Sequence, residues 1–338
     1  MSTMRKPIIL LLAVFLGTAV VAAPVSDAPQ RYVKLTHPAW SENAVIYELN
    51  SRQFTREGTL RAAMRELPRL KTMGIGILWL MPIQPIGVEH RKGSLGSPSA
   101  VRDYRAVNPE FGTLTDLQAF VAEAHSLGLH AILDWVGNHT AWDNPLHAQH
   151  PDWYGCSRKR ANRPTLWFDW SAIIDIDYDQ LALRRYMIEA MQYWVTAAGV
   201  DGFRCGVAGF LPLDFWESAR SALDRVKPVF MLAEYDQRDL HARAFDATYA
   251  WKWNNALADI AAGKADVGAL IGYYSENQGA WPDGATRMVY TENQDQNSWE
   301  GTAVERFGPA LNNAITLSFI GEGIPLIHNG QEAATCGG

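Results

Sequence analysis

The sequence predicts an α/β fold, a (β/α)8 barrel of the TIM type. Eight short apolar segments alternate with amphipathic segments between about Trp40 and Glu332. Eight parallel strands close a barrel of this kind, and its chemistry lies at the C-terminal ends of the strands. Four of the eight segments end in clusters of polar residues, as such a barrel requires. We therefore predict one barrel domain.

The strand predictions rest on short runs rich in apolar, branched and aromatic residues. They cover Ala44–Leu49, Ile75–Met81, His130–Asp134, Val200–Arg204, Val229–Ala233, Phe245–Tyr249, Met288–Tyr290 and Pro325–His328. Apolar residues at helical spacing predict helices between them, most clearly at Leu60–Met73, Leu114–Leu127, Gln180–Ala197 and Pro212–Val226. A longer segment at about 141–177 follows the third strand and predicts a short inserted lobe.

The N-terminal segment has the pattern of a signal peptide. Arg5 and Lys6 precede an apolar run that ends near Ala22 and Ala23, a small-residue cleavage site. The run is shorter than a membrane-spanning helix requires. We therefore expect residues 1–23 to be removed, no stable membrane span, and a secreted or periplasmic protein.

The remaining organisation follows from these two regions. A linker is predicted at 24–39, the barrel at 40–332 and a tail at 333–338. The tail is too short for an eighth helix or for a C-terminal β-sandwich. The barrel is therefore predicted to be truncated after its eighth strand, with an uncovered seam that exposes apolar surface.

The composition excludes some partners. The 338 residues carry 30 basic and 36 acidic side chains, a net charge of −6, without a basic stripe, so no nucleic acid is expected. The 13 tryptophans offer flat faces on which sugar rings stack. Of the three cysteines, Cys205 lies on a predicted core strand and is expected to be a buried thiol, while Cys156 and Cys336 lie outside the predicted strands.

Four polar clusters carry the functional prediction. They read Asp-Trp-Val-Gly-Asn-His at 134–139, Gly-Phe-Arg-Cys-Gly at 202–206, Ala-Glu-Tyr at 233–235 and Glu-Asn-Gln-Asp at 292–295. In this order and spacing the chain resembles the α-amylase family of glycoside hydrolases. The resemblance implies binding of an α-1,4-glucan or maltooligosaccharide and, in the family, a retaining mechanism that uses two carboxyl groups about 5–5.5 Å apart.

The resemblance also assigns roles to individual residues. Glu234 corresponds to the acid/base, and Asp295 corresponds to the acid that stabilises the transition state. The family's sugar-binding positions correspond to Arg204, His139, Gln294, Ser99, Asp103 and Tyr104. The resemblance implies no required cofactor; it leaves calcium as an option, with Asn138 as a ligand.

Three positions depart from the family pattern. Gly206 stands where the family has its nucleophilic aspartate, Gln294 where it has a histidine, and Ser99 where it has a tyrosine that stacks on the sugar. We expect Arg204 to be left with an unpaired positive charge, because it has no carboxylate at position 206. We also expect the pKa of Glu234 to fall, because a nearby negative charge is missing.

Three readings remain open from the sequence. The first is a hydrolase scaffold that is catalytically disabled at Gly206. The second is an active hydrolase in which Asp103, Glu292 or a water molecule replaces the nucleophile, the water giving inversion instead of retention. The third is a non-enzymatic carbohydrate-binding or accessory protein.

Overall fold

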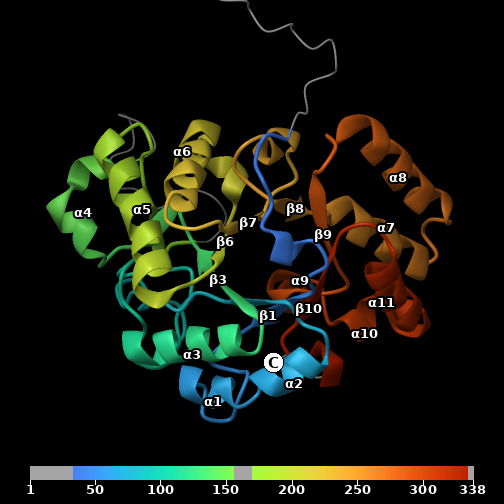
Figure 1. Ribbon diagram of the computed structural model, residues 1–338, viewed down its shortest axis with the longest axis horizontal. Coiled ribbons are helices and arrows are strands. Elements are labelled where there is room, and N and C mark those ends of the chain that lie inside the picture. The colour runs from blue at the N-terminus through green and yellow to red at the C-terminus, as the bar shows by residue number, and fades with distance from the viewer. Residues whose placement is uncertain (1–32, 156–169, 334–338) are drawn as a thin grey trace, which may run out of the picture. The chain divides into compact units, whose positions relative to one another are not determined.

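A computed structural model describes residues 33–155 and 170–333 of the chain. The predicted signal peptide, Cys156 and Cys336 lie outside these ranges. Eight parallel strands form a closed barrel in the order β1-β10-β9-β8-β7-β6-β3-β2 (Figure 1). These strands are β1 (Ile46–Leu49), β2 (Ile77–Leu80), β3 (His130–Trp135), β6 (Gly202–Cys205), β7 (Phe230–Ala233), β8 (Ala247–Tyr249), β9 (Thr286–Tyr290) and β10 (Ile324–His328). The predicted fold class is confirmed, and each barrel strand overlaps a predicted one.

Helices follow the strands and cover the outside of the barrel. They are α1 (Leu60–Met64), α2 (Leu67–Thr72), α3 (Leu114–Ser126), α5 (Leu181–Tyr193), α6 (Leu213–Asp224), α7 (Trp251–Ala261), α8 (Gly268–Ala280), α9 (Gln294–Trp299), α10 (Ala303–Phe307) and α11 (Leu311–Ile320). The single helix predicted at Leu60–Met73 is two helices. Pro68 lies in the first turn of α2, where its missing N–H breaks no helical hydrogen bond.

Short elements complete the chain. A small antiparallel sheet of β4 (His139–Ala141) and β5 (Ile173–Asp175) belongs to the inserted lobe, together with α4 (Pro145–Gln149). One-turn segments are η1 (Ala39–Ser41), η2 (Pro151–Trp153), η3 (Trp194–Ala198), η4 (Ala208–Phe210), η5 (Arg238–His241), η6 (Gly308–Ala310) and η7 (Gln331–Ala333). The lobe thus begins at the end of β3, as the sequence predicted.

Alternation along the strands divides the core into two layers. Side chains that face into the barrel form one cluster, which includes Ile46, Ile77, Trp79, Ile132, Leu232, Tyr249, Met288, Tyr290 and Leu326. Side chains of opposite parity pack outward against the helices, among them Leu78, Leu133 and Phe203. Gly202 permits the close approach of β6 to β7, because an added Cβ there would lie 1.8 Å from the carbonyl oxygen of Phe230.

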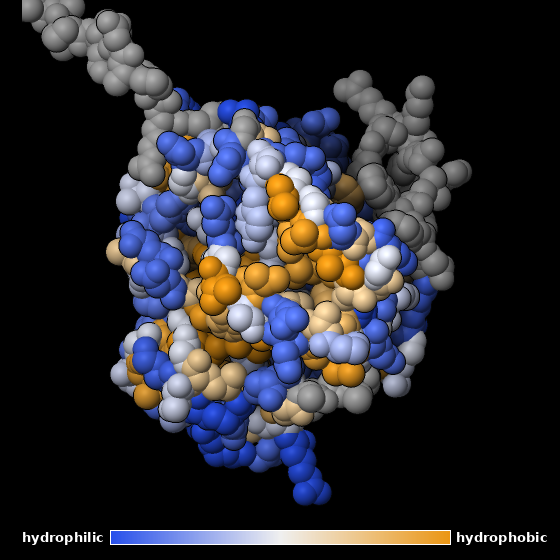
Figure 2. Space-filling view, turned by 90° about the vertical axis from the view of Figure 1, so that its right-hand side faces the viewer, coloured by the Kyte–Doolittle hydropathy of each residue, from blue (hydrophilic) through white to orange (hydrophobic). Residues whose placement is uncertain are grey.

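Large apolar side chains are exposed on the face that carries α8 and α11 (Figure 2). They include Val267 and Ile271 beside or within α8, and Phe319 and Ile320 at the end of α11. In the part of the chain that the structure describes, no helix is long and apolar enough to cross a membrane.

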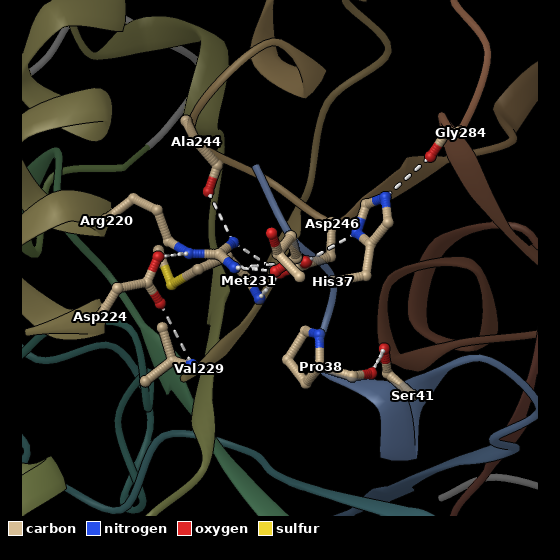
Figure 3. Close-up of polar contacts among 11 residues, drawn as sticks. His37, Pro38, Ser41, Arg220, Asp224, Val229, Met231, Ala244, Asp246 and Gly284 are labelled. Carbon is tan, nitrogen blue, oxygen red and sulfur yellow. Dashed lines mark hydrogen bonds and ion pairs between the residues drawn. The ribbon is translucent and has the colours of Figure 1, made fainter. Parts of the chain in front are cut away.

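A buried network ties the segment before η1 to the barrel (Figure 3). His37 Nδ1 lies 2.8 Å from Asp246 Oδ1, and its Nε2 lies 2.9 Å from the carbonyl oxygen of Gly284. Asp246 also accepts hydrogen bonds from Arg220 and from the backbone N–H of Met231, each at 2.7 Å. Both acceptors of His37 require a hydrogen on the ring nitrogen that faces them, so the geometry calls for a protonated imidazolium.

Candidate active site

A layer of polar side chains lies at the C-terminal ends of the barrel strands. Most members continue the inward-facing series of their strands, so the alternation that fills the core with apolar residues below produces a charged layer above; Asp295 joins it from the first turn of α9. The layer contains Glu48 of β1, Asp134 of β3, Arg204 of β6, Glu234 after β7 and Asp295 after β9.

Arg204 is the centre of this layer. Its guanidinium is 5% exposed, with Nη1 3.2 Å from Asp134 Oδ2 and Nη2 2.9 Å from Glu234 Oε1. Its Nε donates to the hydroxyl of Tyr249 at 3.0 Å, and the group lies over the ring of Trp79 at 4.8 Å. The expectation that Arg204 carries an unpaired charge is wrong, because the carboxylates of Asp134 and Glu234 pair with it.

Glu234 is held from two sides. Its Oε1 pairs with Arg204, and its Oε2 accepts a hydrogen bond of 2.6 Å from the backbone N–H of Val207. Burial raises the pKa of Glu234 to about 7; Arg204 opposes this shift, while the negative charges of Asp295 and Asp134 add to it. The fall predicted from the missing charge refers to a site with a carboxylate at position 206, and it stays a prediction. Desolvation of the carboxylate outweighs the missing charge at position 206.

Gly206 lies between Arg204 and Glu234. A Cβ placed on Gly206 would lie 3.4 Å from Arg204 Nη1, 3.6 Å from Glu234 Oε2 and 3.7 Å from the carbonyl oxygen of Trp135. These are ordinary contact distances, so the site accommodates a side chain at this position. The next residue, Val207, has φ +41°, a left-handed conformation that a β-branched residue rarely adopts. This strained turn aims the Val207 N–H at Glu234.

Asp295 and Gln294 begin α9. The side chain of Asn293 caps this helix, since its Oδ1 accepts from the N–H groups of Asp295 and Gln296 at 3.1 and 2.9 Å. Asp295 is exposed, and the amide of Gln294 donates to Asp295 Oδ2 at 3.2 Å. Asp295 is close enough to raise the pKa values of Glu48, Asp134 and Glu234. The third predicted acid and the acid/base therefore share one electrostatic environment.

The loops after β2 and β3 bring together the next group of predicted residues. His139 Nε2 lies 3.1 Å from the backbone carbonyl oxygen of Ser99, so this nitrogen carries the hydrogen. Burial lowers the pKa of His139 to about 4, which leaves the ring neutral at pH 7 with a buried Nδ1 free to accept a hydrogen bond. Asp103 is exposed and accepts from the N–H of Arg105 at 2.8 Å.

Tyr104 supports this loop from beneath. It is 1% exposed, and its hydroxyl donates to the carbonyl oxygens of Val136 and His139, each at 2.9 Å. The structure thus places Tyr104 under the residues that face the site. Tyr104 was predicted to contact a sugar, but in this buried position it holds the loop after β3.

Comparison with known proteins decides the family. Residues 29–337 match the family model described as alpha amylase, catalytic domain. The chain belongs to the α-amylase family. An α-amylase from Lactobacillus plantarum superimposes with a TM-score of 0.80 at 34% identity, over 88% of this chain and 74% of that chain. The noncanonic maltogenic α-amylase AmyB from Thermotoga neapolitana gives 0.80 at 38% identity, over 87% and 69%.

Curated relatives of this α-amylase-family chain are longer. It is 28% identical to α-amylase MalA of Haloarcula japonica over 310 residues, covering 87% of this chain and 45% of MalA. It is 33% identical to an α-1,4-glucan:maltose-1-phosphate maltosyltransferase of Streptomyces coelicolor over 235 residues, covering 61% of this chain and 34% of that protein. The chain therefore spans about half or less of these two relatives.

One of the substitute nucleophiles considered for this α-amylase-family barrel is engaged elsewhere. Glu292 Oε2 accepts a hydrogen bond of 2.9 Å from the N–H of Ala303, at the start of α10. The carboxylate thereby caps a helix N-terminus, where a negative charge is stabilised. Its predicted role as a replacement nucleophile is not supported by this geometry.

The family's calcium option rests on Asn138. Its Oδ1 is buried without a hydrogen-bond partner, which fits an oxygen ligand. Calcium takes six to eight oxygen ligands. Within residues 33–155 and 170–333, no group of three His, Cys, Asp or Glu side chains gathers at Asn138. Asn138 Oδ1 is therefore a candidate ligand, to which backbone carbonyl or amide oxygens would have to be added.

Glu48 was missed by the sequence reasoning. It is completely buried in β1, and neither carboxylate oxygen has a hydrogen-bond partner. Burial raises the pKa of Glu48 well above its usual range, which favours the neutral acid. The signal was a lone carboxyl residue in the otherwise apolar strand Ile46–Leu49, since unpaired acids are rarely buried.

Proposed function

We propose that this chain binds α-1,4-glucans as an α-amylase-type glycoside hydrolase scaffold and hydrolyses them very slowly. The carrying observation is Gly206, which presents no carboxylate at the position beside Arg204 and Glu234. Without a nucleophile no glycosyl-enzyme intermediate forms. Loss of the nucleophile in another hydrolase costs on the order of 10⁶ in turnover, and we expect a loss of that order here. The signal-peptide pattern supports secretion or export to the periplasm.

Glu234, the acid/base of the family's catalytic pair, supports descent from a hydrolase. A carboxyl group with a pKa of about 7 is suited to protonate a leaving glycosidic oxygen at neutral pH. Asp295 lies in the same environment and would stabilise positive charge on the sugar ring. The chain therefore has a residue for the acid step and lacks one for the nucleophilic step.

The same observation favours a second function, slow hydrolysis with inversion. In this route a water molecule beside Gly206 attacks the anomeric carbon and releases its proton to solvent, while Glu234 protonates the leaving oxygen. This route replaces two displacements by one, so the product anomer is opposite to that of a retaining relative. Anomer-resolved NMR of the first product separates the two routes.

The test is hydrolysis of an activated maltooligosaccharide by the parent chain and by Gly206→Asp, with and without azide or formate. We expect an inactive parent, activity in Gly206→Asp, and azide rescue of the parent with formation of a glycosyl azide of inverted configuration. Gly206→Asp/Glu234→Gln is the matched control and should be inactive on a substrate with a poor leaving group. Substantial release of reducing sugar by the parent that Glu234→Gln abolishes would overturn the disabled reading. If neither azide nor the restored aspartate produces activity, while isothermal titration still detects maltooligosaccharide, a binding role is the better description.

A further inference from the structure

The end of the barrel opposite the candidate active site carries a compact group of metal-ligating side chains. His125 lies in the last turn of α3, His130 is the first residue of β3, and Asp201 immediately precedes β6. All three therefore lie where strands begin, whereas Glu234 lies where a strand ends. In the part of the chain that the structure describes, this is the one group of three His, Cys, Asp or Glu side chains whose ligand atoms converge, within 4.8 Å of one another.

The atoms face one another in a pattern that a metal ion could complete. His125 Nε2 lies 2.8 Å and His130 Nδ1 3.7 Å from the same oxygen, Asp201 Oδ2. His130 Nδ1 is buried and has no hydrogen-bond partner. A tetrahedral ion with ligand bonds of about 2.0–2.2 Å separates its ligand atoms by roughly 3.3–3.5 Å. Small side-chain rotations would bring both histidine nitrogens to that spacing around Asp201 Oδ2.

From this geometry we propose that His125, His130 and Asp201 form a binding site for a divalent transition-metal ion, of which Zn²⁺ is the best match. Two imidazole nitrogens and one carboxylate oxygen suit Zn²⁺, Co²⁺ and Ni²⁺, whereas Ca²⁺ and Mg²⁺ prefer oxygen ligands alone. The side chain of His125 is 38% exposed, which gives an ion access and leaves the fourth position to water. The site is separate from Asn138 and from the family's calcium option.

Surrounding contacts hold two of the three ligands in place. The ring of His130 stacks on Trp40, with centroids 3.9 Å apart and planes at 12°. Asp201 Oδ2 accepts a hydrogen bond from the backbone N–H of Ala131 at 2.8 Å, which orients the carboxylate. Oriented supports of this kind fix metal ligands and are needed for tight binding. His125 is the ligand that has to move most.

Lys227 sets the strength of the site. Its ammonium group pairs with Oδ1 and leaves Oδ2 for the metal, so Asp201 would bind in a monodentate fashion. A positive charge this close repels a divalent cation and weakens its binding. The ion would join α3, β3 and β6 at the base of the barrel. We therefore expect it to stabilise the fold and to leave the chemistry at Glu234 untouched.

The test is titration of the full chain, produced without an affinity tag and freed of metal by chelation, with Co²⁺ and Zn²⁺. We expect one Co²⁺ per chain, with visible absorption bands of a tetrahedral nitrogen–oxygen site, and a rise in Tm with Zn²⁺. His125→Gln keeps a hydrogen-bond donor near Asp201 but removes the ligand, and should weaken binding at least about tenfold. His150→Gln is the control, because it removes a histidine of the inserted lobe that is not part of the three-residue group, and it should bind like the parent.

A third variant predicts the opposite change and keeps the test decisive if His125→Gln does not fold. Lys227→Gln removes the repelling charge and should tighten Co²⁺ binding at least about tenfold. Binding no tighter than about 1 mM by the parent would overturn the site. An equal loss of Co²⁺ affinity in His125→Gln and His150→Gln would also overturn the site, and so would an affinity that Lys227→Gln leaves unchanged. Each of these results would indicate adventitious binding to surface histidines.

Discussion

Arg204 Nη2 lies 2.9 Å from Glu234 Oε1, in a layer where the guanidinium also contacts Asp134. A single buried cation thus pairs with two carboxylates beside Gly206, the position that carries no carboxylate. Glu234 is drawn to the cation from one side and to the N–H of Val207 from the other. The predicted acid is consequently part of an ion-pair network whose balance depends on what stands at position 206.

Gly206→Asp should raise the pKa of Glu234 above about 7. A new carboxylate beside Arg204 competes for the guanidinium and places a like charge near Glu234, and both effects favour the protonated acid. We expect a rise of about one unit or more. Carbon-detected NMR titration of the glutamate carboxyls measures the pKa of Glu234 in the parent and in Gly206→Asp, with Glu234→Gln used to assign the signal. An unchanged or lower value would show that the new side chain points away from Arg204.

Arg204→Gln should destabilise the fold by about 3–5 kcal/mol, because it leaves two buried carboxylates without their cation. Urea unfolding at pH 7 measures the free energy of unfolding. Arg65→Gln is the control, since Arg65 and Glu57 form an exposed ion pair that adds little to stability. Equal losses in the two variants would mean that the Arg204 network contributes no more than a surface pair.

The order of strands and the polar clusters at their ends could be predicted from the sequence. Strand runs such as Ile77–Leu80 and Phe230–Ala233 are short and apolar, and parallel strands buried on both faces leave that signal. The break in the helix predicted at Leu60–Met73 was missed, although Pro68 could have predicted it, because proline is tolerated in the first turn of a helix and rarely further in. The family assignment followed from four clusters in one order.

The charge state of the site could not be predicted from the sequence. The loss of an aspartate at 206 argues for a lower pKa of Glu234, but the burial that raises it depends on how eight strands converge. The same convergence gives Arg204 its alternative partners. The metal-ligand group at His125, His130 and Asp201 is likewise assembled from separate segments, and nothing in their sequence spacing marks it.

Glu48→Gln should stabilise the protein at pH 7 by about 1 kcal/mol or more, since each unit of pKa difference is worth about 1.4 kcal/mol. Burial raises the folded-state pKa of Glu48, so the unfolded chain releases a proton that the folded chain retains. Stability is therefore lost as the pH rises above the unfolded pKa of about 4.5, and the amide removes this loss. Unfolding of parent and variant between pH 4 and 8 tests it, with exposed Glu42→Gln as control. Parallel curves for Glu48→Gln and the parent would show that Glu48 is ionised in the folded state.

His37 should make the stability of the barrel depend on pH near and above neutral pH. The hydrogen bond to Asp246 raises the pKa of His37 above 6.5, while burial opposes the shift. A group whose folded-state pKa is raised contributes fully below its unfolded pKa, and this contribution is lost as the pH rises through the folded value. The parent should therefore lose stability as the pH rises above about 6.5.

His37→Ala should be less stable than the parent at pH 6, and the difference should shrink toward pH 9. The expected loss at pH 6 is about 1–3 kcal/mol, the range for a hydrogen bond to a charged group. His150→Ala serves as the control, because its ring stacks on Trp153 in the lobe and is not part of the described network around Asp246 (Figure 3). A constant difference between His37→Ala and the parent would mean that His37 contributes by packing, and that its bonds to Asp246 and Gly284 do not require the charged ring.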